Sequence, residues 1–223
     1  MRASDITVSG HQPGLLPYPG FFEKARAADI FIICDRFQAV RHQFFNRNEL
    51  ADGTRITVPL DHESWGSEIR DCFIGNDPRW RHKLCKTLRL HFGDAAGAYI
   101  DVINRPWRKI AGLNVALIHV LARDLNVHPE WVHQSLLASG GGNPLRAVSD
   151  DFEALLPVSE RLAAMTEELG GTVWLSGKSG IGYLDEQPFA ARGIRVEYVE
   201  SPKAPSAIEC LRSRRLKVLA GTA

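Results

Sequence analysis

The residue best placed for chemistry is His11, in the turn His11-Gln12-Pro13-Gly14 near the start of the chain. Proline and glycine fix and bend the backbone here, so the turn has a defined shape. Imidazole has an ordinary pKa close to neutral pH, so it can take up and release a proton under physiological conditions. We therefore predict that His11 is a general base. The alternative is that the ring only hydrogen-bonds its own turn.

A second stretch with functional side chains lies late in the chain. It contains Ser176, Gly177, Lys178, Ser179, Gly180, Tyr183 and Asp185. Glycines allow several backbone N–H groups to converge on one anion, and the hydroxyl, ammonium, phenol and carboxylate groups can specify what binds. We predict that this loop binds an anion such as a phosphate. The alternative is a glycine-rich turn without a ligand.

Polar residues near the first stretch complete the candidate site. Asp35 ends an apolar run and is a candidate catalytic partner of His11, or else it caps its own loop. We assign substrate binding to Gln12, Tyr18, Gln38, Asn46, Arg47 and Asn48. For the triplet of Asn46, Arg47 and Asn48, tying down its own loop is the equal alternative.

Several familiar motifs are missing. The other histidines have no metal-ligand spacing, and we expect neither a metal nor a cofactor. The run Ser139 to Pro144 lacks the lysine and hydroxyl of a phosphate-binding Walker loop, which favours a connector. No Gly-x-Ser-x-Gly motif precedes a helix, which argues against a serine nucleophile.

Hydrophobic periodicity predicts the elements that position these residues. Strands are expected at about 6–9, 30–35, 131–133, 172–175 and 194–199, and helices at 21–28, 77–92, 98–103, 110–126, 159–169 and 184–192. Asp52-Gly53 is a turn signal between two runs that can form a hairpin. This order predicts an α/β fold with a mixed or mainly parallel sheet flanked by helices, and a helical insertion at about 77–126.

The same topology predicts one cleft. The His11 turn, Asp35 and the late glycine loop each follow a strand, and the carboxyl ends of parallel strands meet at one edge of a sheet. We therefore expect six residues to line a single cleft there: His11, Asp35, Asn46, Asn48, Ser179 and Tyr183.

Composition sets outer limits on function. The 223 residues are 44% hydrophobic and 24% charged, as in globular proteins with a substantial core. A net charge of +1 gives no bulk attraction to nucleic acid or to anionic membranes, and no apolar run approaches the roughly 20 residues of a membrane-spanning helix. Four widely spaced cysteines and the absence of a signal-peptide pattern lead us to expect a cytoplasmic location.

A combination of motifs resembles the WbqC-like protein family over nearly 200 positions. The resemblance is carried by His11-Gln12-Pro13, Gly20-Phe21-Phe22, Asn46-Arg47-Asn48, Thr57-Val58-Pro59 and Leu175-Ser176-Gly177-Lys178-Ser179-Gly180, in this order. It implies one α/β domain over residues 1–200 of a bacterial cytoplasmic protein. Such proteins are associated with O-antigen or other surface-polysaccharide biosynthesis.

Two departures separate the chain from that family pattern. Cys34 stands where similar sequences usually carry a second acid beside Asp35, which puts a paired-carboxylate metal site in doubt. Residues 201–223 form a divergent segment rich in lysine and arginine, whereas similar sequences tend to continue with a His/Pro/Tyr-rich stretch. Any family function that depends on that segment is uncertain for this chain.

These patterns favour a group transferase. The expected enzyme moves an acyl, aminoacyl or nucleotidyl group to or from an activated, phosphate-bearing small molecule, with His11 as the base. The expected partner is a nucleotide, a sugar nucleotide or a carrier-linked group. For nucleotidyl transfer, the missing second histidine of a His-x-Gly-His motif counts against the assignment. The alternative is a non-catalytic protein that binds a sugar or nucleotide sugar in a polysaccharide assembly pathway.

Overall fold

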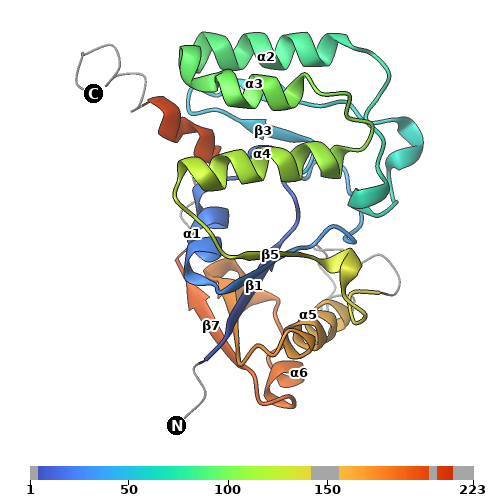
Figure 1. Cartoon of the computed structure of the whole chain (residues 1–223). Coiled ribbons are helices and arrows are strands. Elements are labelled where there is room, and N and C mark those ends of the chain that lie inside the picture. Colours follow the sequence, from blue (N-terminus) through green and yellow to red (C-terminus); the bar gives the residue numbers. More distant parts are fainter. Residues whose placement is uncertain (1–4, 142–155, 201–204, 213–223) are drawn as a thin grey trace, which may run out of the picture.

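The fold is built on a five-stranded parallel sheet with the strand order β5-β2-β1-β6-β7. The computed structural model describes residues 5–141, 156–200 and 205–212 (Figure 1). The strands are β1 (Thr7–His11), β2 (Ile30–Ile33), β5 (Glu130–His133), β6 (Val173–Gly177) and β7 (Arg195–Val199). The predicted α/β class is confirmed, and β1 pairs in parallel with both β2 and β6.

Helices cover both faces of this sheet. The helices α1 (Pro19–Ala27) and α4 (Ile110–Asp124) lie on one face, and α5 (Leu156–Glu168) and α6 (Gln187–Ala190) lie on the other (Figure 1). The chain runs from β1 outward through β2 to β5, then crosses to β6 and runs outward to β7. Right-handed crossovers in two opposite directions place the helices on opposite faces. The direction of winding therefore reverses between β1 and β6.

An outer layer stands on the α4 side of the sheet. It contains α2 (Arg79–Phe92), α3 (Gly97–Ile103) and the antiparallel hairpin of β3 (Arg47–Glu49) and β4 (Arg55–Thr57) (Figure 1). Gly53 has a φ of +82° at the tip of this hairpin, which favours glycine. The predicted helical segment and the predicted hairpin are both confirmed.

Short 3-10 helices join the larger elements. They span His62–Ser64, Ile69–Asp71, Gly93–Ala96, Gln134–Leu136, Lys178–Gly182 and Ala207–Glu209. The predicted helix 184–192 is reduced to α6, because the Asp185 carboxylate accepts the N–H of Gln187 and turns the chain just before the helix. Gly170 and Gly193 follow the predicted helices 159–169 and 184–192 and have φ values of +70° and +69°, as is typical of glycines at helix ends.

Burial explains the sequence of the central strands. In β2, Phe31, Ile32 and Ile33 are fully buried, as expected for a parallel strand covered on both faces.

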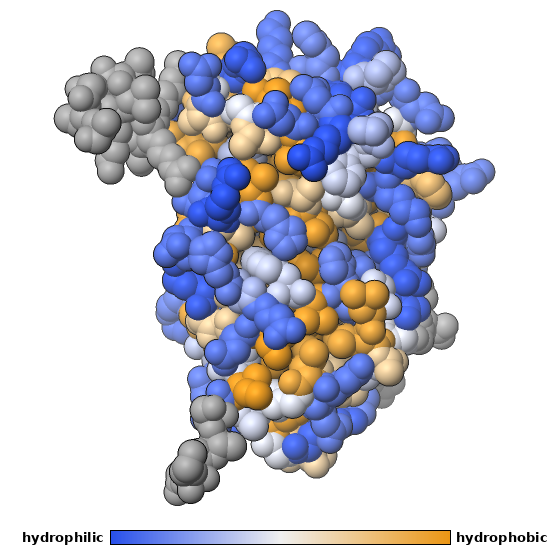
Figure 2. All heavy atoms as spheres, viewed as in Figure 1, coloured by the Kyte–Doolittle hydropathy of each residue, from blue (hydrophilic) through white to orange (hydrophobic). Residues whose placement is uncertain are grey.

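Outside this core, Figure 2 shows hydrophilic side chains gathered over the end of the molecule where α2 lies. In the described ranges, every helix falls short of the length and apolarity that crossing a bilayer would need.

Candidate functional site

A pocket of about 270 Å³ opens at the carboxyl ends of β1 and β6, where the winding of the sheet reverses. Ligands of open α/β sheets bind in such a crevice. The lining residues come from β1 and its turn, from α1, from the loop after β2, from α5, and from β6 and its loop. They are Gly10, His11, Gln12, Tyr18, Lys24, Cys34, Phe37, Gln43, Val158, Leu162, Trp174, Ser176, Gly177, Ser179, Tyr183 and Leu184.

His11 is the last residue of β1 and enters the pocket as a neutral imidazole. Its Nδ1 lies 3.0 Å from the carbonyl oxygen of Gln12, and a carbonyl can only accept, so Nδ1 carries the proton and Nε2 does not. Burial is the main cause that lowers the pKa of His11 to about 3, and the positive charge of Lys24 adds to it. The rings of Tyr18 and Phe21 pack edge-on against the imidazole. Nε2 is therefore held as a hydrogen-bond acceptor.

Lys24 places a buried ammonium group beside His11. The residue is 6% exposed, and its Nζ donates to the carbonyl oxygen of Gly10 at 2.9 Å. Burial lowers the pKa of Lys24 to about 8. Among the described residues, no carboxylate forms an ion pair with it. Because an isolated buried charge is costly, this arrangement favours an anion in the pocket.

Cys34 forms a neutral wall next to Lys24. A Cβ added at Gly10 would lie 3.1 Å from the Cys34 Sγ, so the close approach of these two residues depends on glycine. Burial raises the pKa of Cys34 to about 12, which keeps the side chain a thiol. This thiol occupies the position where a second acid was expected from the family pattern. No carboxylate is therefore supplied to the pocket from this position.

The late glycine loop closes the other side of the pocket. A 3-10 helix over Lys178–Gly182 follows β6, so this segment is a tight turn. A Cβ at Gly180 would lie 2.2 Å from the Ser176 Oγ, so a larger residue there would force the Ser176 hydroxyl to move. Burial raises the pKa of Tyr183, which keeps its phenol protonated. The loop therefore brings hydroxyl groups to the pocket, and the position of one of them depends on Gly180.

The turn after His11 is held from outside by side chains distant in sequence. Asn114 on α4 donates to the carbonyl of Pro13 at 2.8 Å. The carbonyl of Leu16 accepts from Asn48 at 2.7 Å and from the Ser206 hydroxyl at 2.6 Å. Leu16 itself has a φ of +47°, a left-handed conformation that is strained for a residue other than glycine. These bonds hold the strained turn in place, so Asn48 acts on its shape.

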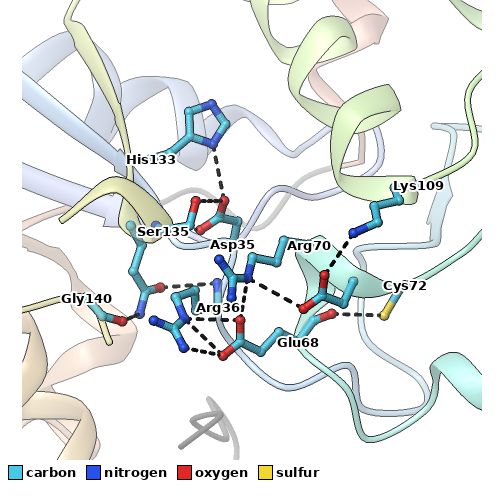
Figure 3. A network of polar contacts seen from close by, with 11 residues as sticks. Asp35, Arg36, Glu68, Arg70, Cys72, Lys109, His133, Ser135 and Gly140 are labelled. Carbon is cyan, nitrogen blue, oxygen red and sulfur yellow. Dashed lines mark hydrogen bonds and ion pairs between the residues drawn. The ribbon is translucent and has the colours of Figure 1, made fainter. Parts of the chain in front are cut away.

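Asp35 joins the ends of β2 and β5 and lies outside the pocket lining (Figure 3). Its carboxylate accepts the Ser135 hydroxyl at 2.7 Å, the Ser135 backbone N–H at 3.0 Å and His133 Nδ1 at 3.3 Å. Burial opposes ionisation, but these bonds outweigh it and lower the pKa of Asp35. In a Ser-His-Asp triad the histidine lies between the serine and the aspartate. Here the aspartate lies between the serine and the histidine, so the three residues do not form such a triad.

A neighbouring ion-pair cluster stabilises the loop that follows Asp35. The Glu68 carboxylate is 8% exposed and accepts from Arg36 Nε at 2.9 Å and from Arg70 Nε at 2.6 Å (Figure 3). Lys109 on the flank of this cluster pairs with Asp71 at 2.9 Å. Within the described part of the chain, no group of three histidine, cysteine, aspartate or glutamate side chains is placed to hold a metal ion.

Sequence comparisons identify relatives of this chain. The model of the WbqC-like protein family matches residues 12–207 of the 223. The chain belongs to the WbqC-like family. It is 27% identical over 196 residues to the uncharacterized protein Rv1507c of Mycobacterium tuberculosis, a match that covers 85% of this chain and 80% of the relative. No solved structure matches it.

The pocket of this WbqC-like protein contains seven of the residues that we singled out from the sequence. They are His11, Gln12, Tyr18, Ser176, Gly177, Ser179 and Tyr183. Of the six residues expected in one cleft, the pocket lining includes His11, Ser179 and Tyr183. The edge of the sheet named by the topology argument is therefore the edge at which this pocket opens. The roles of these residues toward a ligand remain predictions.

The other singled-out residues lie outside the pocket lining: Asp35, Gln38, Asn46, Arg47, Asn48, Lys178, Gly180 and Asp185. Several of their polar groups have local partners, although the buried Asn46 Oδ1 has none among the described residues. Asn46 donates to the Val58 carbonyl, Arg47 bonds His42, and Lys178 pairs with Glu200. Gln38 donates to the Gly66 carbonyl. The expectation of one cleft is thus corrected for Asp35, Asn46 and Asn48, because their side chains hold the surrounding loops.

Lys24 and the wall contributed by α5 were missed by sequence reasoning. Phe21, Lys24, Ala25 and Ala28 recur at spacings of three and four, and this pattern places Lys24 on the buried face of α1. That signal could have identified it. Val158 and Leu162 reach the pocket only because the crossover carries α5 to the opposite face of the sheet.

Proposed function

We propose that this WbqC-like protein is a group transferase that holds its substrate by an anionic group in the pocket between β1 and β6. The observation that carries the proposal is Lys24, a buried ammonium group that lines the pocket and has no acidic partner among the described residues. Substrate-binding pockets combine an enclosed shape with a few convergent polar groups. Here His11, Gln12 and Ser179 stand beside the cation.

In the proposed reaction, His11 is the base. Its Nε2 accepts a proton from the hydroxyl or amine of the acceptor, as the acceptor forms a bond to the transferred acyl, aminoacyl or nucleotidyl group. The bond to the leaving group breaks, and the leaving group takes the electron pair. The charge of Lys24 contributes to the low pKa of His11, so an anion paired with Lys24 would raise the basicity of the imidazole.

The wider role is part of the same proposal. Membership of the WbqC-like family supports a place in bacterial surface-polysaccharide or related biosynthesis. The donor is an activated, phosphate-bearing small molecule such as a nucleotide, a sugar nucleotide or a carrier-linked group. The four free cysteines fit a reducing cytoplasm, where we place the reaction.

A second candidate function is supported by one observation. With a pKa of about 3, His11 is a weak proton acceptor but still a good hydrogen-bond acceptor. That property favours a non-catalytic protein that binds a sugar or nucleotide sugar for a polysaccharide assembly pathway. A binding protein of this kind would give saturable affinity and no product.

The test starts from the molecules that co-purify with the protein, identified by mass spectrometry and then supplied in a turnover assay. We expect His11→Ala and His11→Gln to lose about 10²- to 10⁴-fold in turnover while keeping most of the binding. His133→Gln is the matched control, because His133 aligns with His11 across β2 but lies outside the pocket. If wild type forms product and both His11 variants form it at a similar rate, His11 is not the base.

A further inference from the structure

The charge of the pocket lining restricts the ligand. Among the described residues of the lining, Lys24 is the only lysine, and there is no arginine, aspartate or glutamate. His11 is neutral, so the lining carries a single positive charge. A phosphate monoester carries about −1.5 to −2 charges at neutral pH, and a pyrophosphate-linked group spreads its charge over more atoms. Either would leave negative charge without a partner inside the pocket.

The donors in the pocket also suit a small acid. Lys24 has three N–H bonds, of which one goes to the Gly10 carbonyl, so two can reach a ligand. The Ser179 and Tyr183 hydroxyls can each donate one hydrogen bond, and the side-chain amides of Gln12 and Gln43 can each donate two. The forked guanidinium that grips phosphate oxygens in pairs is missing from this set. One ammonium group among uncharged donors matches the single charge of a carboxylate better than the double charge of a phosphate.

The size of the pocket and the polarity of its lining restrict the rest of the ligand. A volume of about 270 Å³ lies just below the usual range for ligand pockets. Val158, Leu162 and Leu184 make an apolar wall beside the polar one. Trp174 also lines the pocket, and its buried indole N–H has no hydrogen-bond partner. A ligand with a compact carbon skeleton would pack against the apolar wall, and a hydrogen-bond acceptor on that ligand would suit the polar wall.

We propose that the anion paired with Lys24 is the carboxylate of a small, singly charged organic acid whose carbon skeleton packs against the α5 wall. This proposal rests on the proposed function of the pocket as a substrate site and narrows the substrate class. Phosphate groups of an activated donor then stay outside the enclosed volume, and the acid is the molecule that receives or carries the transferred group.

The test uses two matched series of probes, each with a neutral, a carboxylate and a phosphate member. The first is benzamide, benzoate and phenyl phosphate, and the second is glucose, glucuronate and glucose 1-phosphate. Calorimetry at pH 7 measures the dissociation constants for wild type, Lys24→Met and Lys178→Met. In at least one series, we expect the carboxylate to bind wild type about tenfold more tightly than either other member. We expect Lys24→Met to remove that preference and Lys178→Met to keep it.

The possible failures are distinguishable. If a phosphate member binds as tightly as its carboxylate counterpart and depends on Lys24, the carboxylate assignment is overturned and the anion-binding function stands. If no acid in either series binds more tightly than its neutral counterpart, both proposals are overturned. The same conclusion follows if Lys24→Met leaves the affinities unchanged.

Discussion

Replacing Lys24 by methionine tests the pocket through the stability of the empty protein. Methionine has similar length and no charge, so it fills the space of the lysine chain without placing an ammonium group in the core. We expect Lys24→Met to unfold at higher denaturant concentration than wild type at pH 7. Loss of a ligand contact would then coincide with a gain in stability.

The magnitude follows from the pKa of Lys24. Burial lowers this pKa from the ordinary 10.5 to about 8, and each unit corresponds to about 1.4 kcal/mol, so the buried charge costs about 3 kcal/mol at pH 7. The variant also loses the hydrogen bond to the Gly10 carbonyl, a net contribution of about 1 kcal/mol. The expected net gain in unfolding free energy is therefore about 2 kcal/mol.

The pH dependence of stability tests independently whether the buried charge of Lys24 destabilises the folded protein. Between pH 8 and pH 10.5 the unfolded chain keeps the Lys24 proton and the folded protein releases it, so wild-type stability rises with pH in this window. The advantage of Lys24→Met should shrink over the same window. Urea denaturation from pH 7 to pH 10.5 measures it, with Lys178→Met as an exposed control. A variant less stable than wild type at pH 7, or a difference independent of pH, would refute the reasoning.

Two further substitutions test how the pocket is built. Gly180→Ala places a Cβ against the Ser176 hydroxyl and should weaken binding of the tightest probe acid about tenfold, whereas Gly182→Ala, with no atom within 4 Å of its Cβ, should bind like wild type. Equal calorimetric affinities for the two variants would contradict this. Asn48→Ala removes the donor to the carbonyls of Leu15 and Leu16 and should lower the unfolding free energy by about 1–3 kcal/mol, measured by urea denaturation. Wild-type stability would show that the turn does not depend on Asn48.

The α/β class and the strands of the sheet could be predicted because local signals and element order agree. The run Ile30-Phe31-Ile32-Ile33 is apolar at every position, which is typical of a parallel strand covered on both faces. Gly170 and Gly193 correctly mark the ends of helices because their backbones adopt positive φ. The edge of the sheet that carries the pocket follows from the positions of His11 and Ser176 at strand ends.

The membership of the site was harder to predict. Amide side chains such as Asn46 and Asn48 suit ligands and loops equally well, and here each donates to a backbone carbonyl fixed by tertiary structure. Trp174 and Leu162 look like ordinary core residues in the sequence, since nothing local indicates that they line a cavity. Lys24 was also missed, but its spacing within α1 places a charge on the buried face of the helix, so the sequence could have identified it.

The bond between Ser206 and the Leu16 carbonyl joins residues 190 positions apart. Ala207 reinforces it by donating its backbone N–H to the carbonyl of Pro17. During synthesis the chain emerges from its N-terminus, so the His11 turn leaves the ribosome long before the segment that clamps it. The turn therefore gains these two bonds only after Ser206 and Ala207 have been made. A nascent chain stalled before that point would carry the turn but lack these restraints.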